Sequence, residues 1–239
     1  MTALNLLCLP YSGASAMVYA RWRRKLPAWL NVRPVELPGR GARFGEALQT
    51  DMQALARQLA VEQRLAASKP YALLGHSLGA LLAFELAHEL QALGCPAPSA
   101  LFACGTAAPT RREEYDGKDW REPKSDAQLI DELRQLQGTP EEVLANEELM
   151  GLTLPILRAD FLLCGRYAYR QRPPLRCPLQ VLAGDADRAT QEQLLAWAKE
   201  TLGPFDLQMF PGGHFFIHTE EDRVLDALTS RLQPHRLRA

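Results

Sequence analysis

A serine, an aspartate and a histidine occur in that order along this chain, and each directly follows a short apolar segment. Ser77 lies in Gly-His-Ser-Leu-Gly, Asp187 in Gly-Asp-Ala-Asp, and His214 follows Pro-Gly-Gly. A serine hydroxyl becomes a strong nucleophile when a base removes its proton, and an imidazole base needs a third group to fix its tautomer. The three residues therefore predict nucleophilic catalysis by a Ser-His-Asp triad.

The segment around Ser77 fits the G-x-S-x-G nucleophile elbow. Residues 72–74 predict a buried strand, and the small and apolar residues from 78 to about 93 predict a helix. A serine at such a strained strand-to-helix turn leaves no room for side chains two residues away on either side. A chance pentapeptide in an ordinary strand–turn–helix is the alternative. The flanking strand and helix favour the elbow.

An oxyanion hole needs two N–H donors. We expect one from the backbone of Leu78, the residue after the nucleophile, and the second from Ser12 in the small-residue loop after the first strand. For the acid we favour Asp187, with Asp185 as the alternative triad acid or a turn residue. His214 and His218 are four residues apart, but glycines before them favour a loop over a metal-binding helix, so we expect no metal and no cofactor.

The remaining pattern alternates strands with helices. Such alternation predicts an α/β protein with a mainly parallel, doubly wound sheet, the architecture of an α/β-hydrolase. Capping residues are expected at Thr50, Thr190 and Thr219. The expected strands are residues 4–9, 32–37, 72–74, 100–103, 179–183 and 207–210.

The sequence pattern of residues 107–172 predicts helices and no strands. We expect residues 1–106 and 173–239 to form the core and residues 107–172 to form a helical lid, since loops after the strands of such a sheet lie at the site. A capping box at Ser125 opens one lid helix, and Pro155 is expected to kink or break a longer one from 147 to about 169. Apolar lid residues that could face an acyl chain are Leu129, Leu133, Ile156 and Phe161.

Composition excludes several classes of function. The 239 residues carry a net charge of −1 and are 47% apolar, so neither nucleic-acid binding nor a membrane is expected. The amino terminus has no signal-peptide pattern, and the five cysteines form no C-x-x-C pair. We therefore expect a cytoplasmic protein, and a monomer.

Five segments together resemble the type II thioesterases, the stand-alone partners of nonribosomal peptide and polyketide synthases. Three resemble the oxyanion loop, the P-G-R-x-x-R segment and the elbow: residues 9–16, 36–43 and 75–85. Two more resemble the lid helix and the histidine loop: residues 152–160 and 210–216. The resemblance covers nearly the whole chain. Two residues depart from the family's pattern. Ala14 stands where glycine is usual, and Arg188 stands where proline is frequent.

The resemblance implies hydrolysis of acyl thioesters on the phosphopantetheine arm of acyl or peptidyl carrier proteins, which edits mis-primed or stalled synthases. The triad alone does not separate a thioesterase from a carboxylesterase or an acyltransferase, and a non-catalytic binding protein on this fold is a further alternative. Carrier proteins are acidic, so exposed cations could dock one. The candidate docking cations are Arg21, Arg23, Arg24, Lys25, Arg40 and Arg43. For the run of residues 21–25, however, we favour a solvated charged face with no docking role.

Overall fold

A six-stranded parallel β-sheet lies at the centre of the computed structural model, which describes residues 3–112 and 120–236. The strand order is β2-β1-β3-β4-β5-β6, and each neighbouring pair is parallel. This confirms the predicted α/β class with its parallel sheet. The strands are β1 Leu4–Leu9, β2 Leu30–Pro34, β3 Tyr71–His76, β4 Leu101–Cys104, β5 Leu179–Gly184 and β6 Phe205–Phe210.

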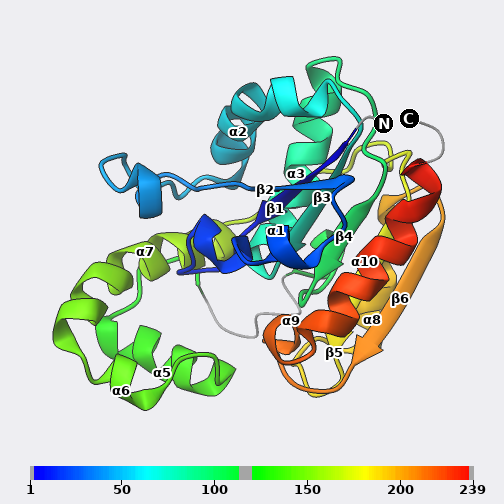
Figure 1. The fold of residues 1–239 in the computed structure, drawn as a ribbon. Helices are drawn as coiled ribbons and strands as arrows, with labels where there is room; N and C mark the ends of the chain where they lie inside the picture. The colour runs from blue at the N-terminus through cyan, green and yellow to red at the C-terminus, as the bar shows by residue number, and fades with distance from the viewer. Residues whose placement is uncertain (1–2, 113–119, 237–239) are drawn as a thin grey trace.

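Both faces of the sheet are covered by helices (Figure 1). Alternate strand residues point to opposite faces. Leu7 and Leu73 therefore join the core under α2 and α3, whereas Leu6 and Leu74 join the core under α1 and α10. The helices of these two layers are α1 Trp22–Lys25, α2 Met52–Ala67, α3 Leu78–Ala92, α8 Gln191–Leu195, α9 Phe216–Thr219 and α10 Glu221–Arg236.

A third group of helices, α5 Asp126–Leu136, α6 Glu141–Leu144 and α7 Glu147–Gly165, lies between β4 and β5 in the chain. In Figure 1, α5 and α6 stand well away from the sheet, and α7 leads back toward it. These helices have an apolar cluster of their own, which includes Leu129, Leu133 and Leu157. The exact bounds 107–172 of a lid stay a prediction.

Several local expectations were wrong in detail. The second strand begins and ends earlier than expected, although the N–H of Val35 still donates to the carbonyl of Cys8 (2.9 Å). Asp51, not Thr50, caps α2, because its carboxylate accepts two backbone N–H groups. Thr219 does not cap the last helix but ends α9. The long lid helix continues through Pro155 and ends at Gly165.

The capping boxes at Ser125 and Thr190 are formed as expected, each with a glutamine three residues later. Within the two described ranges, no helix is both long enough and apolar enough to span a membrane.

Candidate active site

Ser77 lies at the sharp turn between β3 and α3, with φ 55° and ψ −117°. A non-glycine residue with positive φ is uncommon and is held in place by its surroundings. Its N–H donates to the carbonyl of Cys104 (2.8 Å), which ties the turn to the next strand. A Cβ on Gly75 would overlap the carbonyl of Gly79, and one on Gly79 would overlap that of Leu9. Both glycines are therefore required by backbone packing.

His214 and Asp187 meet across two neighbouring loops, one after β6 and one after β5. Nδ1 of His214 lies 3.0 Å from Oδ2 and 3.2 Å from Oδ1 of Asp187. Asp187 also accepts the backbone N–H of Arg188 (2.7 Å). A carboxylate at Nδ1 favours the tautomer in which Nε2 has a free lone pair, which is the form a general base needs.

Asp185 has a different environment. It is exposed, and its Oδ1 accepts the backbone N–H of Gly212 (3.0 Å). The same two loops are joined by the N–H of Ala186, which donates to the carbonyl of Gly212 (2.9 Å). Asp185 therefore links the acid loop to the histidine loop and does not contact the imidazole by any hydrogen bond in the described structure.

Ser77 and His214 line the same small cavity, together with Ser12 from the loop after β1. The free volume is about 30 Å³, which is room for roughly two water molecules. Helices α5 and α7 close one side. The other lining residues are Arg112, Trp120, Glu132, Leu136, Phe161, Cys164 and Arg188.

The four predicted lid residues separate into two groups. Phe161 lines the cavity and stacks on Trp120 with ring centroids 4.6 Å apart. Leu129 and Leu133 are buried in the apolar cluster of the lid helices, and Ile156 is half-buried and is not among the lining residues. Hydrophobic periodicity finds the apolar side of a helix but does not tell which of its residues reach a neighbouring site.

Sequence reasoning missed the charged part of the cavity wall. The guanidinium of Arg188 donates to the buried carboxylate of Glu132 on α5, with Nη2–Oε1 of 2.6 Å. This ion pair joins the lid to the loop that carries Asp187. The only sequence signal was Arg188 at a position where proline was expected.

His76 packs beside His214. Its ring is fully buried and its centroid lies 4.9 Å from that of His214. Burial, followed by the neighbouring charges of His214 and His218, lowers the pKa of His76 well below its usual value. His76 therefore stays uncharged, so it adds no positive charge next to His214 when that ring takes up a proton.

His218 contacts the loop after β1. Its Nε2 lies 3.0 Å from the hydroxyl of Tyr11, in the loop after β1. In the described part of the chain, no group of three or more His, Cys, Asp or Glu side chains could hold a metal ion.

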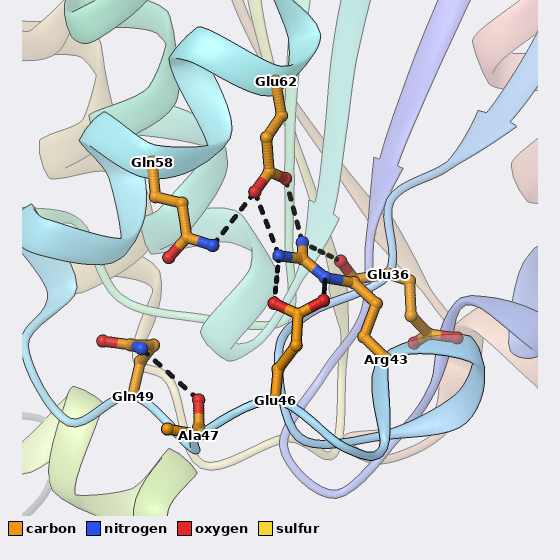
Figure 2. A network of polar contacts seen from close by, with 7 residues as sticks. All are labelled: Glu36, Arg43, Glu46, Ala47, Gln49, Gln58 and Glu62. Atoms are coloured by element: carbon orange, nitrogen blue, oxygen red, sulfur yellow. Dashed lines mark hydrogen bonds and ion pairs between the residues drawn. The ribbon is translucent and has the colours of Figure 1, made fainter.

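Two of the proposed docking cations are engaged in ion pairs within the protein. Arg40 is buried against Asp160 on α7. Arg43 forms ion pairs with Glu46 and Glu62 and donates to the carbonyl of Glu36, as Figure 2 shows. Arg40 is therefore not accessible to a partner, whereas a docking role for Arg43 stays a prediction.

The cations of the run 21–25 differ in their surroundings. Arg21 and Lys25 pair with Glu221, and Lys25 also pairs with Asp222. Arg23 and Arg24 are exposed.

Comparison with known proteins identifies the family. The family model for the thioesterase domain matches residues 5–232. Linear gramicidin dehydrogenase LgrE of Brevibacillus parabrevis is 38% identical, over 94% of this chain and 86% of LgrE. The structure of the type II thioesterase BorB from the borrelidin biosynthetic cluster has a TM-score of 0.87 at 39% identity, covering 97% of this chain and 93% of BorB.

The crystal structure of ClbQ from the colibactin NRPS/PKS pathway has a TM-score of 0.91 at 33% identity and covers 100% of both chains. The family match spans nearly all of the chain, and these two structures cover 97% and 100% of it. The chain belongs to the thioesterase family and is a hydrolase that acts on thioester bonds.

Proposed function

We propose that the chain hydrolyses acyl thioesters held on the phosphopantetheine arm of carrier proteins, with Ser77 as nucleophile, His214 as base and Asp187 as the acid that orients it. The observation that carries this proposal is that Ser77 and His214 line one cavity while Asp187 bonds to Nδ1 of His214. The descriptions of BorB as a type II thioesterase and of ClbQ as part of an NRPS/PKS pathway support the substrate class.

In the proposed acylation, Nε2 of His214 takes the proton of Ser77 as its Oγ attacks the thioester carbonyl carbon. The carbonyl oxygen becomes negative and accepts hydrogen bonds from the N–H groups of Leu78 and Ser12. Leu78 opens α3, so the positive end of that helix dipole also faces this charge. The C–S bond then breaks, and the imidazolium returns the proton to the departing sulfur.

Deacylation follows the same path with water as the nucleophile. His214 takes a proton from water, the hydroxide adds to the acyl-serine ester, and the C–O bond to Ser77 breaks. The proton returns to the Ser77 oxygen and the free acid leaves. A thiol with a pKa of about 8.5 is a good leaving group near neutral pH, so this site needs less acid assistance than an amidase does.

The helices between β4 and β5 act in this proposal as a lid. Leu136, Phe161 and Cys164 belong to these helices and line the cavity. Its free volume of about 30 Å³ is smaller than an acyl group, so the lid helices must shift before a substrate enters.

The direct test combines labelling and a substrate panel. We expect a fluorophosphonate probe to label the protein and Ser77→Ala to abolish both labelling and hydrolysis. The same acyl groups should be cleaved faster from a carrier protein than as coenzyme A thioesters or oxygen esters. Preference for oxygen esters would indicate a carboxylesterase, transfer to an added alcohol would indicate an acyltransferase, and absence of labelling would indicate a binding protein.

The surface test uses Arg23 and Arg24, because both are exposed. If they receive an acidic carrier, Arg23→Glu together with Arg24→Glu should raise KM for the carrier-bound thioester and leave the coenzyme A thioester unchanged. Equal kinetics on both substrates would identify the run as a solvated charged face.

The name of LgrE offers a dehydrogenase as a second candidate. The dinucleotide fingerprint needs G-x-G-x-x-G in the turn after the first strand. In this chain the corresponding turn, residues 10–15, contains Gly13 as its single glycine. We therefore favour hydrolysis, and we expect no NADPH-dependent reduction of an acyl thioester.

A further inference from the structure

Asp160 on α7 is a buried carboxylate that contacts the loop expected to form the oxyanion hole. Its side chain has no exposed surface, and its Oδ2 accepts the backbone N–H of Gly13 at 2.8 Å. Gly13 directly follows Ser12, which lines the cavity beside Ser77. A residue of the lid helix therefore bonds to the backbone one residue from a predicted oxyanion donor.

A second contact from the same face of α7 holds this loop. Gly13 has φ +80°, and a Cβ there would overlap the side chain of Leu157. Leu157 and Asp160 are three residues apart, so they share one face of the helix. The loop is thus packed against Leu157 and hydrogen-bonded to Asp160.

Arg40 fixes the orientation of the carboxylate. Its Nη1 and Nη2 donate to Oδ2 and Oδ1 of Asp160 at 2.6 and 2.7 Å, and the arginine side chain is 4% exposed. A two-point guanidinium–carboxylate pair has a defined geometry. The positive charge also offsets that of the carboxylate, which would otherwise oppose negative charge developing nearby.

The bond to Gly13 has a specific geometric effect. The N–H of Gly13 lies in the same rigid peptide plane as the carbonyl of Ser12. A carboxylate that holds this plane restricts the backbone torsions of Ser12. It therefore also restricts the direction in which the N–H of Ser12 points. An oxyanion donor is effective only when it already points at the developing charge.

We propose that Asp160, held by Arg40, is a positioning residue that orients the Ser12 amide for transition-state stabilisation. This inference rests on the proposed function. Asp160 acts through the Ser12–Gly13 peptide and does not itself contact substrate. The alternative is that the Arg40–Asp160 pair only fastens the lid to the core.

A matched control exists elsewhere in the fold. Glu85 on α3 is also fully buried and pairs with Arg172 (2.7 Å), and it accepts the hydroxyl of Tyr167 (2.7 Å). Asp160→Asn and Glu85→Gln each neutralise one buried carboxylate that is paired with an arginine. Both should lower the Tm, because each removes the negative charge that compensates an arginine.

Only Asp160→Asn should impair the chemical step. The amide oxygen can still accept from Gly13, but the second bond to Arg40 that fixes the carboxylate is lost, so the orientation of the loop is no longer set. We expect kcat to fall roughly 10- to 100-fold with KM nearly unchanged, since a misdirected donor affects the transition state and not substrate binding. The Ki of a trifluoromethyl ketone analogue of the thioester, whose adduct oxygen occupies the oxyanion hole, should rise by the same factor. Glu85→Gln should keep both values.

A double variant separates stability from positioning. Asp160→Leu with Arg40→Met replaces the pair by apolar side chains of similar size, a change that is often neutral or stabilising. We expect its Tm to recover while kcat stays low, because Gly13 then lacks its acceptor. If Asp160→Asn does not fold, the double variant alone tests whether Asp160 positions the loop or only stabilises the fold.

Recovery of kcat in the double variant, or equal loss of kcat in Asp160→Asn and Glu85→Gln, would overturn the inference. Ser77→Ala measured alongside separates this result from the proposed function. Turnover that survives in Ser77→Ala would reject the triad itself. An inactive Ser77→Ala with a fully active Asp160→Asn would reject only the positioning role.

Discussion

The imidazole of His214 lies 3.0 Å from the carboxylate of Asp187, and the two side chains keep only 6% and 2% of their surface exposed. A charge-assisted hydrogen bond gains strength when water is excluded from it. The pair is thus suited to fix one imidazole tautomer beside Ser77, and Asp185 on the same loop makes no such contact.

Asp187→Asn should lower kcat by about 10³- to 10⁴-fold, because an amide at Nδ1 no longer selects the tautomer with a free Nε2. Asp185→Asn should stay within roughly threefold of the parent protein, because the amide oxygen can still accept the N–H of Gly212. Steady-state hydrolysis of one acyl thioester measures both. A larger loss in Asp185→Asn than in Asp187→Asn would show that Asp185, not Asp187, is the acid of the triad.

Gly79→Ala should damage the elbow. Its new Cβ would overlap the backbone carbonyls of Leu9 and Pro10, so the loop after β1 has to move. We expect a loss of more than about 2 kcal/mol in the free energy of unfolding, together with reduced hydrolysis. Urea unfolding monitors the first effect.

The matched control is Gly151→Ala in α7, where no atom lies within 4 Å of the added Cβ. A helix-interior glycine replaced by alanine should gain about 0.5–1 kcal/mol. If both glycine variants behave alike, the backbone contact at Gly79 is not the cause of its effect.

Cys164 should report opening of the lid. It lines the cavity, is 6% exposed and forms no disulfide. In a Cys95→Ser background, which removes the half-buried thiol outside this site, N-ethylmaleimide should react slowly with Cys164 and inactivate the protein. Cys164→Ala should resist inactivation. Mass spectrometry measures how completely Cys164 is alkylated. If the fully alkylated protein keeps full activity, the cavity is not the acyl site.

Stability should fall on mild acidification, in part through His88. Burial, with a smaller contribution from Arg172, lowers the pKa of His88 from 6.5 to about 4. Between these values the unfolded chain binds a proton that the folded chain excludes, so the free energy of unfolding is complete above pH 6.5 and decreases toward pH 4.

Partial exposure of His88 reduces this effect to about 1 kcal/mol between pH 7 and pH 5. Urea unfolding at both pH values should show a smaller decrease for His88→Leu than for the parent protein. An identical decrease in the two proteins would mean that His88 is already solvated in the fold.

The strands and the loops that follow them were predictable, because apolar runs bounded by glycine and proline are local features. Ser77, Asp187 and His214 each follow a strand within a few residues, so parallel pairing alone brings them to one edge of the sheet. The first expected strand, residues 4–9, coincides with β1, and the other expected strands differ by one to three residues at their ends.

Burial of charged residues was not predictable from the sequence. Arg40 and Asp160 are separated by 120 positions, and each alone resembles a surface residue. Their pairing depends on how α7 packs against two loops, which no local pattern encodes. The same limit applies to the pairing of Glu132 with Arg188, and to Glu85, which is buried and bonds to Tyr167 and Arg172.

His214 is carried by the loop after β6, the outermost strand on its side of the sheet and the last of the six described strands along the chain. Ser77, in contrast, is carried by a strand near the middle of the sheet. If the proposed triad is correct, a growing chain presents the Ser77 hydroxyl long before it has the imidazole that is proposed to activate it. We therefore expect the polypeptide to be inactive during its synthesis and to hydrolyse thioesters only after β6 has docked.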